Sequence, residues 1–194
     1  MHTYSMRGCC RERYIFFIAL AAIAILAIAK QAAGMFGVAV SITTFTVFGA
    51  LYFVFDRWLW KFSWIGKLIG IPNLSGTWNI QGNTNGADGN AREWSGTATI
   101  EQTWSHIAIS IETNASRSRS AMAAIEYDPG HGYRLVYGYA NTPKNTGNEL
   151  RSHNGTCDAI VKPDLRSVEA AYFNDHQRQT FGTMKWTRIL DQEK

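Results

Sequence analysis

Arginine, tyrosine and tryptophan residues recur at alternate positions in several short stretches of the chain. In an extended strand this spacing places side chains on one face, because successive side chains point to opposite faces. Guanidinium groups bind phosphates through paired hydrogen bonds, and aromatic rings stack on flat bases. The residues that we assign to a ligand-binding inner face are Arg117, Arg119, Tyr137, Tyr139, Arg151, Trp104 and Tyr172. This combination predicts a ligand with flat rings and anionic groups.

The inward orientation of Arg117 and Arg119 is inferred from the parity that they share with the apolar Ala123 and Ile125. The alternative is that both arginines lie in a solvated hairpin and that the tyrosines are ordinary core residues. A β-bulge would also reverse the parity. Arg151 is placed inward because it shares the parity of Cys157.

Catalytic and metal-binding motifs do not accompany these residues. The five histidines lack metal-ligand spacing, and the sequence has no P-loop, GxSxG or HExxH motif. Glu126 and Asp128 are interpreted as charges at a hairpin end rather than as an acid–base pair. We therefore expect a protein that is not an enzyme and that uses no metal or cofactor.

Eight stretches after residue 70 alternate as half-buried strands do. They are residues 74–82, 93–104, 106–113, 116–127, 133–140, 149–161, 167–174 and 180–189. Short steps between them predict an all-β fold, an eight-stranded antiparallel up-and-down barrel over residues 71–194, with a two-sheet sandwich as the alternative. In such a meander the long polar loops at 83–92, 141–148 and 175–179 share one end, which we predict to be an open mouth.

Two uncharged apolar stretches, 14–29 and 34–55, precede the barrel. We expect them to form a hairpin of two transmembrane helices, at about 14–33 and 34–55, with a tight turn at residues 30–33. The aromatic and basic residues of 56–70 predict a segment along the membrane surface, which completes a membrane region at 1–70. A cleaved signal peptide ending near Ala29 is the alternative.

Charge is unevenly distributed along the chain. Of the 19 Lys and Arg residues, seven precede residue 71, against two of the 15 acidic residues. These cations flank the apolar stretches, with only Lys30 between them, so the positive-inside rule places both termini and the barrel in the cytoplasm. The barrel region is nearly neutral, which argues against DNA or RNA as a ligand. The three cysteines show no disulfide or metal pattern and indicate a reducing compartment.

Gly76 and Trp78, at the start of the first predicted strand, resemble the lipocalin signature. That resemblance implies that Trp78 closes one end of the barrel and that Arg188 covers it. With the two-helix anchor and the junction at residues 71–78 (IPNLSGTW), the chain resembles the transmembrane β-barrel effector of bacterial CBASS anti-phage systems.

The resemblance implies a specific function. On phage infection, a cGAS/DncV-like nucleotidyltransferase makes a cyclic dinucleotide, which the barrel binds. The effector then oligomerises, and its helices disrupt the cell inner membrane, causing abortive infection. The expected partners are therefore the cyclic dinucleotide, membrane lipid and further copies of the chain. The alternatives are a membrane-anchored, lipocalin-like carrier of an apolar ligand and a structural interaction domain with a filled core.

Overall fold

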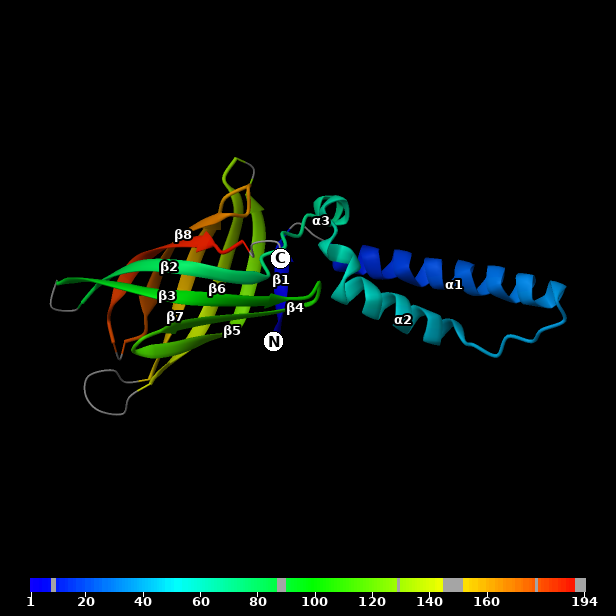
Figure 1. Cartoon of the computed structure of the whole chain (residues 1–194), viewed down its shortest axis with the longest axis horizontal. Helices are drawn as coiled ribbons and strands as arrows, with labels where there is room; N and C mark the ends of the chain where they lie inside the picture. The colour runs from blue at the N-terminus through cyan, green and yellow to red at the C-terminus, as the bar shows by residue number, and fades with distance from the viewer. Residues whose placement is uncertain (8–9, 87–89, 129, 145–151, 177, 191–194) are drawn as a thin grey trace. The chain divides into compact units, whose positions relative to one another are not determined.

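The structure, a computed structural model, describes residues 1–7, 10–86, 90–128, 130–144, 152–176 and 178–190. The chain divides into two compact units (Figure 1). One unit contains Met1–Gly8 together with Gly70–Lys194, and the other contains Cys9–Ile69. The chain therefore leaves the first unit after its N-terminal residues and returns to it at Gly70.

Nine strands close into a barrel in the first unit. Their order around the ring is β1 (His2–Arg7), β4 (His106–Thr113), β3 (Ala91–Gln102), β2 (Gly76–Asn85), β9 (Phe181–Arg188), β8 (Ser167–Asn174), β7 (His153–Val161), β6 (Gly132–Pro143) and β5 (Ser116–Asp128). From β2 to β9, successive strands pair antiparallel, as predicted. The first residues of the predicted strand 149–161 lie outside the described residues.

The ninth strand, β1, corrects the prediction of eight. It pairs in parallel with β5 from Tyr4 onward and antiparallel with β4 at His2 and Thr3. Tyr4 is buried, and Gln102 Nε2 donates a hydrogen bond of 3.2 Å to its hydroxyl oxygen. Local alternation of the later strands cannot reveal this pairing, because β1 joins β4 and β5 only through tertiary contact.

A β-bulge between Ser120 and Met122 divides β5 into two halves. The first half pairs directly with β4, whereas β1 lies between β4 and the second half. The extra residue shifts the alternation of side chains along the strand. Ile125 therefore faces the core, while Arg119 faces outward, although their parity is the same.

The base of the barrel is closed around Trp78, as the lipocalin signature implies. The indole is fully buried, and the Arg188 guanidinium carbon lies 5.2 Å from a ring centroid of Trp78. Arg188 also donates hydrogen bonds to the backbone oxygens of Asn73 and Ser75. Gly76 has a φ of +129°, a conformation that glycine adopts without strain.

Apolar side chains fill the half of the barrel next to this base. Trp78 and Trp186 pack with their ring centroids 6.4 Å apart, and Tyr137 lies 6.3 Å from Trp186. Each such buried large side chain contributes roughly 1.5–3 kcal/mol of transfer free energy. This half of the barrel is therefore filled by side chains and closes the bottom of the open half.

The second unit is helical and differs from the expected boundaries. It contains α1 (Arg11–Met35), α2 (Thr44–Arg57), a short 3-10 helix η1 (Leu59–Lys61) and α3 (Ser63–Ile69). The predicted turn at residues 30–33 is wrong: these residues, good helix formers on the whole, continue α1. The helix ends near Gly37 (φ +69°), and Thr43 then caps α2 by accepting a hydrogen bond from the backbone N–H of Thr46.

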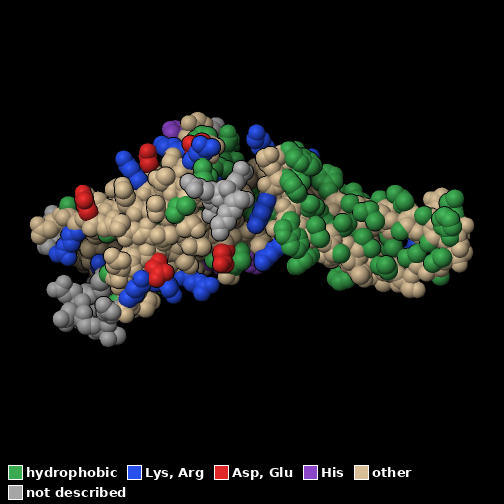
Figure 2. All heavy atoms as spheres, in the orientation of Figure 1, with side chains coloured by type: hydrophobic (Ala, Val, Ile, Leu, Met, Phe, Trp, Pro, Cys, Tyr) green, Lys and Arg blue, Asp and Glu red, His purple; other side chains and the backbone are tan. Residues whose placement is uncertain are grey.

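Apolar side chains cover the helical unit on its outside. Hydrophobic side chains gather over this unit in Figure 2, whereas Lys, Arg, Asp and Glu are spread over the barrel. Helix α1 is long enough to cross a bilayer, with a mean hydropathy of 2.3 in its most apolar window. Within the described part of the chain it is the one helix of that length and composition. Helices α1 and α2 pack against each other.

Candidate ligand-binding site

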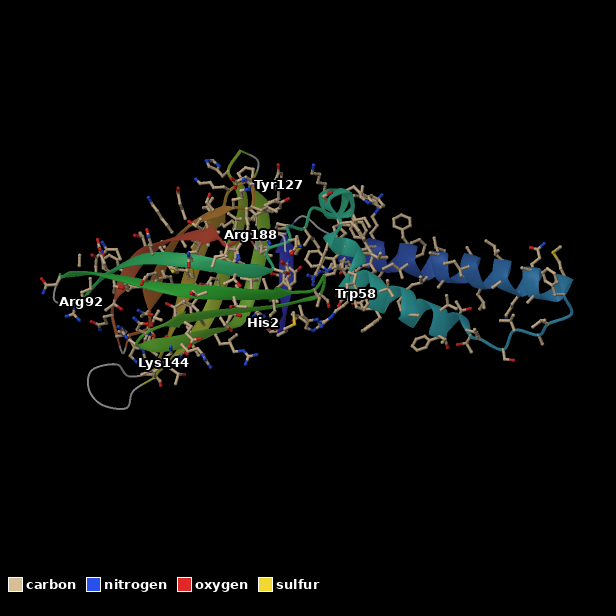
Figure 3. The ribbon with its side chains drawn as sticks, viewed as in Figure 1. His2, Trp58, Arg92, Tyr127, Lys144 and Arg188 are labelled. Carbon is tan, nitrogen blue, oxygen red and sulfur yellow. The ribbon has the colours of Figure 1, made fainter. Side chains whose placement is uncertain are left out.

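A cavity of about 540 Å³ opens at the end of the barrel opposite Trp78. Its lining residues come from the ends of β2, β4, β6 and β8 and the starts of the strands that follow them. This is the end that loop lengths predicted as the mouth. In Figure 3, Arg92 and Lys144 lie toward the mouth and Arg188 toward the base. The volume is in the range of small-molecule sites, roughly 300–1,000 Å³.

The floor of the cavity is apolar and aromatic, and the buried side chains of Tyr137, Ile111 and Met184 line it. Among the described residues, the buried Tyr137 hydroxyl has only the Cys157 thiol, a weak partner, beside it. Burial raises the pKa of Tyr137 well above its usual value and that of the Cys157 thiol to about 12. Both groups are therefore neutral at physiological pH.

Three aromatic rings form the walls and are held by hydrogen bonds. Trp94 Nε1 donates to the Tyr172 hydroxyl oxygen at 3.2 Å, and this hydroxyl also bonds that of Thr84. Tyr139 donates from its hydroxyl to Asn174 Oδ1 at 2.9 Å. Because these contacts fix the rings, flat faces are presented to the cavity before any ligand enters.

Glycine residues make room for two of these rings. A Cβ atom at Gly82 would overlap the indole of Trp94, and one at Gly155 would come within 2.5 Å of the Tyr139 ring. Both glycines lie in strands of the barrel wall, where a side chain would otherwise be expected. The rings therefore lie flat against bare backbone.

Two arginines bring positive charge to the mouth. Arg92 lies near the start of β3 and Arg178 between β8 and β9, and both line the cavity. The pKa of Tyr139 is raised, mainly by burial, and the charge of Arg178 opposes that rise, which places Arg178 near the ring. Glu93 also lines the cavity, so an acidic group lies beside the two cations among the described lining residues.

Two further polar side chains that line the cavity are buried. Asn141 of β6 and His153 of β7 oppose each other in the sheet register, and both are buried and line the cavity. Amide and imidazole groups donate and accept hydrogen bonds at the edges of bases. The cavity thus contains stacking faces, cations and polar edge groups together.

The structure brings three of the predicted site residues into this cavity, namely Tyr137, Tyr139 and Tyr172. Trp104 is fully buried but lies in the turn between β3 and β4 at the base, away from the cavity lining. Arg151 lies outside the described residues.

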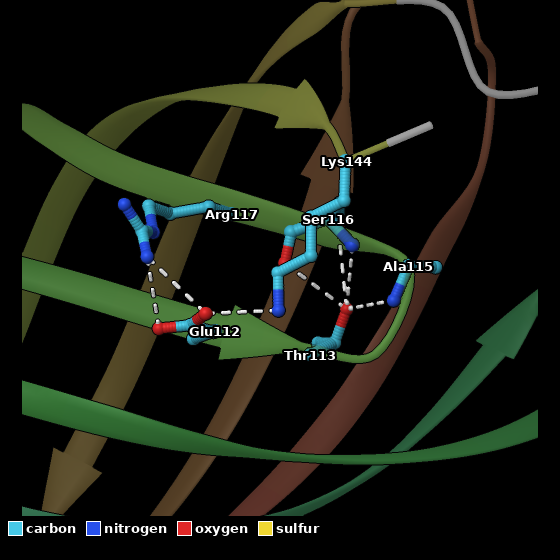
Figure 4. A network of polar contacts seen from close by, with 6 residues as sticks. All are labelled: Glu112, Thr113, Ala115, Ser116, Arg117 and Lys144. Carbon is cyan, nitrogen blue, oxygen red and sulfur yellow. Dashed lines mark hydrogen bonds and ion pairs between the residues drawn. The ribbon is translucent and has the colours of Figure 1, made fainter. Parts of the chain in front are cut away.

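The inward orientation predicted for Arg117 and Arg119 is wrong. The β5 bulge turns both outward, and Ser116 and Ser118 line the cavity in their place. Arg117 instead bonds the carboxylate of Glu112 at 3.2 Å, which Lys144 also pairs with at 2.8 Å (Figure 4). Lys144 and Arg117 hold the pKa of Glu112 below its usual value.

Five residues that line the cavity were not among the predicted site residues, namely Arg92, Arg178, Trp94, Asn141 and His153. A signal was present, because the two arginines fall in the loops 83–92 and 175–179 that were predicted to form the mouth. Trp94 and His153 share the inward parity of their strands. Combining loop position with parity, rather than parity alone, would have found them.

A closed barrel with one filled end, an aromatic cavity and a cationic mouth defines a receptor for a small ligand with flat rings and negative charge. The Cap15 cyclic dinucleotide receptor domain matches residues 69–188 of the chain. CD-NTase-associated protein 15 of Yersinia aleksiciae is 43% identical over 143 residues, covering 74% of this chain and 68% of that protein. The chain therefore belongs to the Cap15 family, and the resemblance to the CBASS effector is confirmed. Membership supports a CBASS effector that binds a cyclic dinucleotide.

Proposed function

We propose that the mouth cavity is the place where the cyclic dinucleotide binds. The proposal rests on the observation that aromatic rings and cations line the same cavity. The rings are Trp94, Tyr139 and Tyr172, and the cations are Arg92 and Arg178. Stacking on an aromatic ring contributes roughly 1–3 kcal/mol per base. Arginine presents a planar fork that matches phosphate oxygens, so the two cations suit the two phosphates of such a ligand.

Binding drives the next steps: the chain oligomerises and its helical unit disrupts the bacterial inner membrane. Helix α1 supplies one crossing. Because β1 and residues 70–194 belong to the same barrel, a chain that crosses the bilayer once must cross back before Gly70. Residues 36–55 are the uncharged stretch that remains for this crossing.

The second crossing requires a rearrangement around α2. Its 14 residues span about 21 Å at helical rise, short of a hydrocarbon core of about 30 Å. Residues 38–43 are not helical. In lipid they become helical or lie among headgroups, because hydrocarbon does not accept unpaired backbone groups. Segment 56–70, with its tryptophans and lysines, lies along the cytoplasmic surface.

Calorimetry of the full chain in detergent, with a panel of cyclic dinucleotides, tests the binding step. We expect one member to bind, and Arg178→Ala to weaken it at least tenfold, since a cation is removed from the mouth. Arg117→Ala is the matched control, because Arg117 faces outward, and should bind as the unmodified chain does. Equal losses in both variants, or no binding by any member, would contradict the proposal.

A carrier of an apolar ligand is the second candidate, and the apolar floor at Ile111 and Met184 favours it. Mass spectrometry of lipid extracted from the purified chain separates the two. A carrier would retain a stoichiometric apolar molecule that cyclic dinucleotides do not displace.

A further inference from the structure

The outer wall of the barrel has a hollow of its own. A groove of about 630 Å³ runs over the outer faces of β5 to β8. Met122 and Phe173 line it, and 67% and 59% of their respective surfaces are exposed. Small residues, among them Ala124, Gly138 and Ala140, lie between them. Exposed large apolar side chains around a hollow of small residues are typical of an interaction surface.

The two large side chains lie in one row across the sheet. In the register, Met122 of β5 opposes Gly138 of β6. Phe173 of β8 lies in the same row, opposite Thr156 of β7, which itself opposes Gly138. Neighbouring strands are about 4.8 Å apart, so Met122 and Phe173 are about 14 Å apart. The outer faces of β2 and β3 instead carry polar residues such as Thr97.

We propose that this groove binds the same groove of a second copy of the chain. The inference rests on the proposed function in one respect: barrels anchored in one membrane associate side by side, with their mouths pointing the same way. A two-fold axis parallel to the barrel axes then places β5 of one copy against β8 of the other. In this arrangement Met122 of each copy packs against Phe173 of the other.

Charge supports the same arrangement. Arg119 and Asp175 lie one row nearer the mouth: Asp175 lines the groove, and Arg119 lies on β5 opposite Ala140. Asp175 bonds Asn154, which also opposes Ala140, through its backbone and through Oδ2, which accepts from the Asn154 N–H at 2.9 Å. Arg119 forms no ion pair with another described residue. The two-fold axis brings Arg119 of one copy to Asp175 of the other, twice in each dimer.

The groove and the ligand cavity share part of the wall of β6. Tyr137 and Tyr139 contact both hollows, and Gly138 between them has no side chain. The Tyr139 ring packs on Gly155 of β7. A ligand that shifts these rings therefore shifts the backbone that forms the groove, which makes association depend on the ligand.

Cysteine cross-linking of the full chain in detergent tests the interface. In a Cys9→Ser, Cys10→Ser background, Met122→Cys and Phe173→Cys are combined in one chain. They are too far apart to pair within it, because disulfides need Cα atoms within about 7 Å. Mild oxidation should give a covalent dimer, with a several-fold higher yield when the cyclic dinucleotide that binds is added.

Thr97→Cys with Thr187→Cys is the matched control. Both residues are exposed on the polar wall, and both oppose Asn79. A control yield equal to that of the groove pair would overturn the proposal. Ladders longer than a dimer would overturn the two-fold arrangement.

Met122→Glu gives a second test that does not depend on oxidation. Sedimentation should show self-association weakened at least tenfold, while calorimetry shows that the ligand still binds, with its affinity reduced only by the lost coupling to association. Normal association by a variant that binds ligand normally would refute the groove and leave the receptor function standing. If no cyclic dinucleotide binds the unmodified chain, the receptor function fails, and the oxidation yield without ligand still decides the groove.

Discussion

Two glycine residues beneath the aromatic rings determine the shape of the cavity, because they have no side chain there. Trp94 lies against Gly82, and Tyr139 lies against Gly155. Hydrogen bonds from Trp94 to Tyr172 and from Tyr139 to Asn174 then fix the plane of each ring. A methyl group at either glycine forces the ring to move, and ring placement decides how well a base can stack.

Gly82→Ala is therefore expected to weaken ligand binding at least tenfold, a loss of about 1.4 kcal/mol or more. The fold should survive, because Trp94 can swing toward the open cavity. Titration calorimetry measures the affinity, and Gly49→Ala serves as control, because nothing lies within 4 Å of a Cβ atom there. An unchanged affinity for Gly82→Ala would mean that Trp94 does not contact the ligand.

Cys157 should make the protein less stable in alkali. Burial raises the pKa of its thiol to about 12, from its usual value of 9.0. Between those values the unfolded chain loses the proton and the folded chain keeps it, so the free energy of unfolding falls as pH rises. Tyr137 and Tyr139, whose pKa values are also raised by burial, act in the same direction.

Urea denaturation in detergent at pH 8 and pH 10.5 measures this effect. The midpoint should fall at the higher pH, and Cys157→Ala should reduce the fall. A midpoint that rises with pH would contradict the buried, neutral state of the thiol.

At the scale of the elements, the bulge in β5 lies where β1 enters the sheet between β4 and β5. β4 and β5 pair directly near the mouth, and β1 lies between them near the base. The bulge between Ser120 and Met122 occurs where the two strands separate. The Ser120 hydroxyl bonds His2 Nε2 at 2.8 Å and accepts from the backbone N–H of Ile109 at 2.9 Å. Ser120 thus connects all three strands.

Tyr4→Ala tests how much β1 contributes to stability. Tyr4 is 3% exposed and accepts a hydrogen bond from Gln102. Truncating a buried aromatic side chain costs about 3–5 kcal/mol, so the thermal midpoint should fall by several degrees or more. Thr3→Ala, at an exposed position of the same strand, should leave it unchanged. Equal midpoints for the two variants would show that β1 is dispensable.

Parity and loop length predicted the meander and its mouth because both are local properties. Each of the eight strand stretches contains a strand, and the tyrosines of β6 face inward as alternation requires. Alternation gave the wrong face for Arg117 and Arg119 because of the bulge in β5. That bulge occurs where β4 and β5 separate, which is a tertiary feature that local alternation does not reveal. β1 was not among the predicted strands, because a six-residue segment separated from the other strands by the helical unit gives no hint of its partners.

At the scale of the whole molecule, both ends of the helical segment connect to the barrel. β1 ends at Arg7, α1 begins at Arg11, and the barrel resumes at Gly70. A helical segment fixed at both ends to one folded unit crosses a membrane an even number of times. This constraint comes from the fold and concerns only the number of crossings, whereas the side of the membrane is predicted from the Lys and Arg distribution.

Reporter fusions test the topology. Alkaline phosphatase joined to the C-terminus should be inactive in bacteria, and a fusion in the α1–α2 connection, after Gly37, should be active. Green fluorescent protein at the C-terminus is the control and should fluoresce. An active C-terminal phosphatase would place the barrel outside the cytoplasm and would refute the predicted location.

Photochemical cross-linking tests the central claim, that the cyclic dinucleotide occupies the mouth cavity. The full chain is irradiated with a radiolabelled cyclic dinucleotide, and the labelled peptides are identified by mass spectrometry. The account predicts label on the peptides that contain Trp94, Tyr139 or Tyr172, and competition by unlabelled ligand. Competed label confined to the outer face around Arg117 and Arg119, or to the helical unit, would contradict it.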